Sequence, residues 1–488
     1  MRFIFSLLSA VTLSAADKPN IVFILADDLG YGEAGCYGQE KIKTPHLDQL
    51  AKEGMLFTRH YTGAAVCAPA RCVLMTGRHL GNAEIRNNGD SKNGRLFPGQ
   101  WPITEEAITI AEALKGAGYT TGGFGKWGLG PTDSTGSPIR QGFDRFYGYN
   151  CQRNAHSFYP PFLDDDESID PINKNPIPGH KRQPKGEVKA DDYRAEVYAP
   201  DRILEEALEF LDENKEKPFF LYLPFVEPHV AMHPPQEWMD RYPKEWDEEK
   251  RAYRGQNGYL PHPRPRAGYA SMISDLDEHI GSVLARLKQH GLEENTIVIF
   301  TSDNGATHPG RDPKFHIGGA DPDFFNSGAG LRGWKGSLYE GGIRVPTIVR
   351  WPGKTAAGST TEAPSYFPDW FPTLCSIAGA EKPAALDGSD LHPLLIGDEF
   401  QRDKPMVWEF HGYGTQLAVT DFPWKAIKQE AKKKDSVWEL YHLDQDPNET
   451  TNLAEKHPEI INRLSKISRT DRTPNPRAKL PAYDQLSK

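Results

Sequence analysis

Cysteine is scarce in this sequence. The chain has 488 residues but only five cysteines, at positions 36, 67, 72, 151 and 375. Domains that depend on disulfides for their stability carry a much higher density of cysteine, so a disulfide scaffold is excluded. An odd count leaves at least one thiol without a bridging partner. We therefore expect one cysteine to have another role, while the pairing of the other four stays open.

The sequence also has no excess of positive charge. Lysine and arginine total 57 against 67 aspartates and glutamates, which gives a formal net charge of −10. General binding to nucleic acid needs a basic surface, so nucleic acid is excluded as a general partner. An anionic substrate fits this composition only if its binding pocket is locally positive.

Long apolar runs are absent except at the N-terminus. Arg2 precedes an apolar run over residues 3–13, which is followed by Ser14, Ala15 and Ala16. A basic start, a short apolar stretch and small residues at its end are typical of a secretory signal peptide, here residues 1–16. The run is too short to span a bilayer. We expect a secreted or periplasmic protein without stable insertion into a membrane.

The mature chain alternates apolar strands with helical patterns. Continuous apolar runs predict strands buried on both faces, at residues 20–26, 218–225 and 296–300. This order predicts an α/β fold with a large, mainly parallel mixed sheet flanked by helices. After residue 400, short strands predict a small C-terminal antiparallel α+β domain. We expect a catalytic domain over residues 17–400 and a small domain with a loose tail over residues 401–488.

Several local elements are also predicted. Helical patterns lie at residues 45–53, 104–116, 201–214, 269–290 and 458–466. The small domain is expected to have strands at 406–410, 416–420 and 437–443. Residues 160–190 are rich in Asp, Pro and Lys and are expected to form a long surface loop.

Polar side chains follow several predicted strands at the points where these strands end. They are Asp27 with Asp28, Lys126, His229, and Asp303 with Asn304. In parallel sheets, functional sites form beyond the carboxyl ends of the strands. The shared position predicts that these side chains belong to one site.

A cysteine-proline-arginine segment lies between the first two of these positions. Residues 66–72 read Val-Cys-Ala-Pro-Ala-Arg-Cys, and Pro69 suits the first turn of a helix that ends at Gly77. Cys67 is then expected just before a helix N-terminus, where backbone N–H groups favour an anion. Arg71, one turn later, can bond an oxyanion that Cys67 carries or attacks. The alternative is an ordinary buried cysteine at a helix start.

Four of the strand-end residues have hard oxygen side chains. Asp27, Asp28, Asp303 and Asn304 suit Ca²⁺, and Mg²⁺ less well. A single aspartate after a strand is more often a helix cap or a turn residue. Their joint occurrence beside Cys67 makes the metal site the better interpretation.

These motifs resemble the type I sulfatases, a family of the alkaline-phosphatase-like superfamily that includes arylsulfatases and N-acetylgalactosamine-sulfatases. The Cys-x-Pro-x-Arg motif continues into Thr-Gly-Arg at residues 76–78, and residues 20–32 and 301–305 resemble the family's metal-binding segments. The resemblance implies that a maturation enzyme oxidises Cys67 to formylglycine. It also implies that the modified Cys67 joins the four oxygen residues as a metal ligand.

The resemblance implies roles for the remaining strand-end residues. Lys126 and Lys335, each in a glycine-rich segment, match the two lysines that bind sulfate, and Arg71 assists them. His229 matches the histidine near the ester oxygen. The alternatives are solvated lysines in surface loops and a structural histidine.

One position departs from the family pattern. Most relatives have a histidine that helps to expel sulfate, where this chain has Gly128. Another group must take that role, and His156 is the candidate because it lies among aromatic residues. The alternative is a histidine of the substrate loop or the core.

The implied function is that of an exported sulfatase acting on a sulfate ester, most plausibly of a carbohydrate. Phe158, Tyr159 and Trp334 are aromatic residues that can stack on sugar rings or simply pack. One alternative is a phosphate or phosphonate monoester hydrolase of the same superfamily. The other is an inactive sulfatase-like protein that binds glycans.

Overall fold

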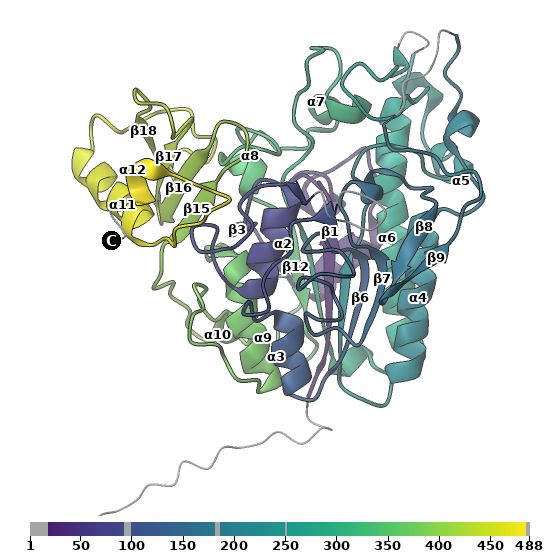
Figure 1. Cartoon of the computed structure of the whole chain (residues 1–488), viewed down its shortest axis with the longest axis horizontal. Helices are drawn as coiled ribbons and strands as arrows, with labels where there is room; N and C mark the ends of the chain where they lie inside the picture. Colours follow the sequence, from purple (N-terminus) through teal and green to yellow (C-terminus); the bar gives the residue numbers. More distant parts are fainter. Residues whose placement is uncertain (1–17, 92–98, 181–185, 249–250, 485–488) are drawn as a thin grey trace, which may run out of the picture.

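A ten-stranded mixed sheet forms the centre of the molecule (Figure 1). The computed structural model describes residues 18–91, 99–180, 186–248 and 251–484, so the proposed signal peptide lies outside the described residues. The strand order is β13-β2-β12-β11-β1-β10-β6-β7-β8-β9. The strands are β1 (Asn20–Ala26), β2 (Met55–Phe57), β6 (Thr120–Lys126), β7 (Arg145–Tyr149), β8 (Phe162–Asp165), β9 (Ser168–Pro171), β10 (Phe219–Pro224), β11 (Thr296–Ser302), β12 (Thr347–Arg350) and β13 (Ser359–Thr361).

The five central strands of the sheet are parallel. β1 pairs in parallel with β10 and β11, and the parallel block continues through β6 to β7. The outer strands β8, β9 and β12 pair antiparallel with their neighbours. The predicted mixed, mainly parallel sheet is therefore confirmed, and β1 has the predicted bounds because all its residues are buried and those after Asn20 are apolar.

Helices cover both faces of the sheet (Figure 1). Alternate residues of β1 enter two separate hydrophobic cores, with Val22 and Ile24 on one face and Ile21 and Phe23 on the other. The first core is closed by α1 (Pro45–Glu53), α4 (Ala199–Asn214) and α6 (Pro265–Gln289). The second is closed by α2 (Cys67–Thr76), α3 (Ile110–Gly116) and α9 (Trp370–Ala378).

Two local predictions in the large domain were wrong. Helix α3 begins at Ile110, not at residue 104, because Thr109 and Glu112 form the capping box that starts it. Thr104 instead donates its N–H and hydroxyl to Glu84, each at 2.9 Å. The expected loop at 160–190 contains the hairpin β8–β9, which extends the sheet by two antiparallel strands.

The small domain is a four-stranded antiparallel sheet with one helix across it. Its strands are β15 (Met406–Phe410), β16 (Gln416–Asp421), β17 (Trp424–Lys428) and β18 (Trp438–His442), and its helix is α11 (Pro458–Thr470). Strand β17 was not predicted, because its sequence places Lys425 where an apolar residue is expected. The tail is not loose as far as residue 484. Arg472 is buried and bonds Glu409 at 2.5 and 3.0 Å.

A buried lysine joins the two domains. Lys425 of β17 lies 2.8 Å from Glu340 of the large domain and 2.9 Å from Glu449. All three side chains are fully buried. Burial raises the pKa of Glu449 to about 7, and Lys425 opposes this shift. The ammonium group therefore compensates two carboxyl groups that have no access to water.

All five cysteines lie in the part of the chain that the structure describes. All five cysteines are free in the structure, and four of them are buried. Of the helices in the described residues, none has the length and apolar character needed to cross a bilayer.

Replacing Lys425 by alanine is expected to destabilise the protein. Removing one partner from a buried ion pair costs about 3–5 kcal/mol, because the remaining carboxylates stay buried without compensation. The measurement is Tm by calorimetry for Lys425→Ala against Lys433→Ala, whose side chain is exposed and pairs with Glu430. Equal Tm values for the two variants would contradict the structural role of Lys425.

Candidate active site

The ends of four neighbouring strands bring the predicted site residues together. β11, β1, β10 and β6 are adjacent in the sheet, and their carboxyl ends lie at one edge. The residues placed there are Asp27, Asp28, Lys126, His229, Asp303 and Asn304, all buried. The backbone N–H of Asp28 donates to Oδ1 of Asp303 at 3.1 Å, across 275 positions of sequence. Parallel pairing therefore assembles the site from distant segments.

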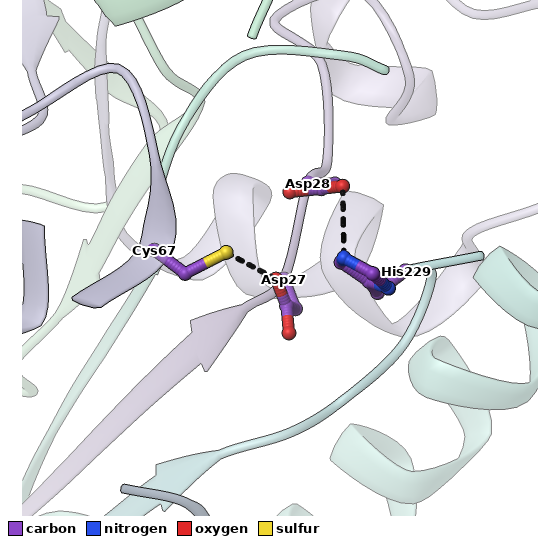
Figure 2. A group of neighbouring side chains, drawn as sticks. All are labelled: Asp27, Asp28, Cys67 and His229. Carbon is purple, nitrogen blue, oxygen red and sulfur yellow. Dashed lines mark hydrogen bonds and ion pairs between the residues drawn. The ribbon is translucent and has the colours of Figure 1, made fainter. Parts of the chain in front are cut away.

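Cys67 is the first residue of α2. The residue before it, Val66, is extended, and Gly77 ends the helix with φ of +63° as predicted. The Sγ atom donates to Oδ1 of Asp27 at 3.4 Å (Figure 2). Nζ of Lys335 lies 3.5 Å from the same sulfur. Cys67 thus lies between a carboxylate and an ammonium group at the start of a helix.

The thiol of Cys67 is a weak nucleophile in this environment. The residue is 1% exposed, and burial raises the pKa of its thiol well above the usual range. The negative charge of Asp27 adds to this shift, while Lys126 and Lys335 oppose it. Since the thiolate is the reactive form, unmodified Cys67 is inert at neutral pH.

Arg71 holds two strand ends in place. Its Nε and Nη2 donate to Oδ2 of Asp303 at 3.1 and 2.8 Å, and its Nη1 donates to the carbonyl of Lys126. Burial opposes the charged form, but Asp303 and Asp27 raise the pKa of the guanidinium. Arg71 is fully buried, so it braces the site from behind.

Two carboxylate–ammonium pairs flank Cys67. Nζ of Lys126 bonds Oδ2 of Asp27, and Nζ of Lys335 bonds the two oxygens of Asp28 at 2.6 and 2.8 Å. Burial works to raise the pKa of Asp27, but Lys126 and the other nearby cations hold it well below its usual range. Asp27 is therefore ionised, and the two lysines remain charged although they are buried.

Asp28 has a strained backbone that its neighbours hold in place. Its φ is +71°, a left-handed conformation that costs about 1–2 kcal/mol in a residue other than glycine. Nδ2 of Asn304 donates to Oδ1 of Asp28 at 2.8 Å. Strain of this kind is concentrated at functional sites, where surrounding contacts fix it.

The oxygen atoms of this cluster fit a hard divalent cation. Oδ1 of Asn304 is buried and has no hydrogen-bond partner in the part of the chain that the structure describes. Ligand atoms of Asp27, Asp28, Cys67 and His229 all lie within 4.8 Å of one another. Carboxylate and amide oxygens are the ligands that Ca²⁺ prefers. The structure therefore has a possible acidic metal site where the sequence predicts one.

His229 and His156 form a stacked pair at the wall of the site. Nε2 of His229 lies 3.7 Å from Oδ2 of Asp28, as Figure 2 shows. The two imidazole rings stack with centroids 4.9 Å apart and planes inclined by 6°. Burial lowers the pKa of both rings well below the usual value, and nearby positive charges add to this shift. Both histidines are therefore neutral in the resting site.

The segment that carries His229 is anchored from behind. The N–H of Asp27 donates to the carbonyl of Glu227 at 3.0 Å, and Nδ1 of His279 lies 2.9 Å from the Glu227 carboxylate. Burial disfavours a charged His279, but Asp275, Asp201 and Glu227 raise its pKa well above the usual value. This second cluster of acidic groups thus compensates an imidazolium and supports the site.

A cavity of about 120 Å³ opens onto Cys67. Besides Cys67, four of the predicted residues line it, namely Asp28, His156, His229 and Lys335. The sequence analysis missed the other polar and aromatic wall residues, which are Asn88, Gln152, Tyr259, Thr307, His308 and Tyr413. They lie in loops, where neither periodicity nor the strand-end rule gives a signal.

The aromatic residues proposed from sequence do not line this cavity. Phe158 and Tyr159 are 3% and 4% exposed, and both rings pack against Tyr198. Trp334 packs edge-on against His316. Packing is therefore the correct interpretation for Phe158 and Tyr159.

Gly128 leaves room for a neighbouring amide. Its φ is +85°, and a Cβ atom at this position would lie 3.1 Å from Nε2 of Gln152. Gln152 is 6% exposed, and its Nε2 has no hydrogen-bond partner among the described residues. The cavity therefore has an amide donor next to the position where the resemblance implies a histidine.

Comparison with protein families gives two matches. The family model described as Sulfatase matches residues 19–380. A second model, described as N-sulphoglucosamine sulphohydrolase, C-terminal, matches residues 330–471. Together they cover nearly all of the described chain.

Individual relatives are similar over almost the whole chain. Human arylsulfatase A is 32% identical over 94% of this chain and 88% of its own length. An N-acetylgalactosamine-6-O-sulfatase of Bacteroides thetaiotaomicron is 30% identical over 94% of each chain. A crystal structure of Ps i-CgsB in complex with k-i-k-neocarrahexaose superimposes with a TM-score of 0.71 at 25% identity, over 92% of this chain and 91% of that one.

Calcium ions are expected to raise Tm, because an ion that binds only the folded state increases the free energy of unfolding. The increase is about 2.7 kcal/mol when the ion is at 100 times its dissociation constant. Asn304→Ala removes the unpartnered oxygen and should abolish most of this shift. The measurement is Tm with excess Ca²⁺ and with chelator. Asp201→Asn, in the second acidic cluster, should keep the shift. If Asp201→Asn lost the shift and Asn304→Ala kept it, the ion would belong to the second cluster.

Proposed function

Because the chain belongs to the sulfatase family of sulfuric ester hydrolases, we propose that it is an exported enzyme that removes sulfate from a carbohydrate. The observation that carries this proposal is the position of Cys67 between Asp27 and Lys335, in a cavity at the parallel strand ends. Residues 1–16 are proposed to direct export.

The carbohydrate part of the proposal has support from two relatives. One relative is named as an N-acetylgalactosamine-6-O-sulfatase, and the solved Ps i-CgsB structure contains a neocarrahexaose. Lys335 lines the pocket, Lys126 bonds Asp27 beside Cys67, and both lysines remain charged, which agrees with an anionic substrate. In the structure each of these charges is balanced by an aspartate, Asp27 for Lys126 and Asp28 for Lys335.

The nucleophile is proposed to be a formylglycine hydrate at position 67. Burial keeps the thiol protonated, so a reactive group has to be created by a maturation enzyme with an external two-electron oxidant, which turns the CH2–SH group into an aldehyde and expels the sulfur as sulfide. Hydration of the resulting aldehyde places two hydroxyl groups on one carbon. One hydroxyl attacks sulfur, and loss of the proton from the other restores the aldehyde and releases sulfate.

The chain's own residues supply the remaining functions. Lys126 and Lys335 bind the sulfuryl oxygens in place of the carboxylates that they now contact, and this stabilises charge in the transition state. Arg71 acts by fixing Asp303 and the carbonyl of Lys126. His229 protonates the leaving alcohol. It is neutral at rest, but a bound anion favours its charged form.

A Ca²⁺ ion is proposed as the cofactor, held by Asp27, Asp28, Asp303, Asn304 and the modified Cys67. Mg²⁺ fits less well because it demands a stricter octahedral arrangement of ligands. Bound there, the ion would supply Lewis-acid polarisation of an oxygen and charge that favours the deprotonated nucleophile.

His156 is proposed as the base that accepts the proton from the second hydroxyl. It lines the same cavity as Cys67, and its pKa is lowered, so it is neutral and able to accept a proton. Its Nδ1 lies 2.8 Å from Nε2 of His180, which fixes the ring orientation. In this role His156 takes the function of the histidine that most relatives have at the position of Gly128.

The mass of the tryptic peptide that contains position 67 tests the nucleophile. Protein from its own host should give a peptide about 18 Da lighter than the cysteine form, since sulfur and two hydrogens give way to one oxygen. The same preparation should release inorganic sulfate from sulfated sugars faster than phosphate from phosphate monoesters.

Two outcomes would overturn this assignment. Faster release of phosphate would favour the monoester hydrolase. Fully modified protein that binds sulfated glycans without releasing sulfate would favour an inactive binding protein.

Replacing His156 by alanine is expected to lower kcat by a factor of about 10²–10⁴, the usual contribution of a general base. Because the first step does not need this base, the variant should release one equivalent of alcohol rapidly and sulfate slowly. The measurement is rapid quench of a single turnover. His290→Ala, at a surface pair with Asp212, is the control. Unchanged turnover in His156→Ala would exclude this role.

A further inference from the structure

The cavity at Cys67 is too small to enclose a sugar. Its volume is about 120 Å³, whereas pockets that enclose a whole organic ligand measure roughly 300–1,000 Å³. Its walls include Lys335 and His229, which the proposed function assigns to the sulfuryl group and its ester oxygen, and Asp28, which it assigns to the metal. The ring of a sulfated sugar must therefore extend across the rim of the cavity.

One exposed aromatic ring lies at this rim. Four large apolar side chains of the described chain are exposed, namely Ile108, Ile169, Tyr413 and Val437. Of these four, only Tyr413 lines the cavity, and it is 56% exposed. It lies in the loop between β15 and β16, so the small domain contributes directly to the active-site cavity.

The backbone around Tyr413 is held in an unusual conformation. Tyr413 and Thr415 have φ values of +48° and +63°, and Gly414 between them has φ of +95°. Left-handed residues other than glycine cost about 1–2 kcal/mol each. Surrounding contacts must stabilise this turn, and they determine where the ring is placed.

Three contacts fix the tyrosine ring. Its plane lies against Phe410, with centroids 6.1 Å apart and an inclination of 27°. Its hydroxyl lies 3.1 Å from Nε2 of His308, which also lines the cavity. The ring also lies over Gly336, where a Cβ atom would come within 3.1 Å of it. Tyr413 is therefore immobilised while more than half of its surface stays open to solvent.

The position of Gly336 links the ring to the proposed sulfate site. Gly336 directly follows Lys335, and the N–H of Lys335 donates to the carbonyl of Ala306 at 2.9 Å. The side chain of Gln416 in β16 donates to the carbonyl of Gly336 at 2.7 Å. The loop that carries the sulfate-binding lysine is thus bonded to the strand that follows Tyr413, which fixes the distance between the two groups.

We propose that Tyr413 is the platform on which the sugar ring of the substrate stacks, so that the small domain determines which sulfated sugars bind. This inference rests on the proposed function. The C–H face of a pyranose is apolar, and covering an exposed aromatic ring with it removes apolar surface from water.

Binding to a variant that cannot turn over tests this platform directly. In a Cys67→Ala background with Ca²⁺ present, N-acetylgalactosamine 6-sulfate is titrated by calorimetry. Tyr413→Ala should weaken its binding about tenfold, in the range expected for loss of one aromatic contact. Tyr413→Phe keeps the ring and should bind within about twofold of the parent.

Inorganic sulfate is the second probe, because it has no ring to stack. Its affinity should be the same with and without Tyr413→Ala, whereas a general disturbance of the site would weaken both ligands. Val437→Ala removes another exposed apolar side chain of the small domain and is the matched control. Equal sugar affinity in Tyr413→Ala and Val437→Ala would overturn the platform. So would equal weakening of sugar and sulfate binding in Tyr413→Ala, or absence of sugar binding to the Cys67 variant that keeps Tyr413.

These results are separate from those that test the proposed function. Failure of the platform leaves sulfate release by the modified wild-type enzyme intact. Failure of the proposed function appears instead as an unmodified Cys67 or as absence of sulfate release in the protein from its own host.

Discussion

Compensation of buried charge is the constraint on which this structure depends. Asp27, Asp28 and Asp303 are fully buried, and each is paired with a cation from another segment, respectively Lys126, Lys335 and Arg71. A carboxylate left alone in this position would be neutralised or would destabilise the fold. The sheet order, the start of α2 and the loop carrying Lys335 must therefore form together. The same balance leaves the two lysines ready to exchange a carboxylate for an anionic ligand.

The bounds of helices and strands were predicted correctly from the sequence where burial alone determines them. β1 and α1 have their predicted bounds, since one is apolar throughout and the other starts with proline after threonine. Prediction failed where a long-range partner overrides the local pattern. β17 contains a buried lysine that pairs with Glu340 and Glu449. The tail is ordered by several long-range contacts, among them the pair of Arg472 with Glu409 and the bonds from Asn475 to the carbonyls of Ala83 and Glu84.

Part of the site was also predictable from the sequence, because several of its residues follow strands of the parallel sheet. Asp27, Lys126, His229 and Asp303 follow strands, and strand ends of a parallel sheet meet whatever the loops do. Gln152 and Tyr413 belong to loops whose course depends on packing across the domains. Their side chains carry no motif, so only the folded chain shows that they face the same cavity. The groups expected to act on sulfur were thus found from sequence, while those expected to select the alcohol were not.

The burial of Cys67 limits when another protein can reach this residue. The sulfur is 1% exposed, lies at the start of a fully buried helix and touches two charged groups. No second protein can reach it once the fold is complete. The oxidation proposed for Cys67 would therefore have to take place before the chain folds. Under that proposal, a chain that folds before oxidation keeps a buried thiol at position 67 and lacks the proposed nucleophile.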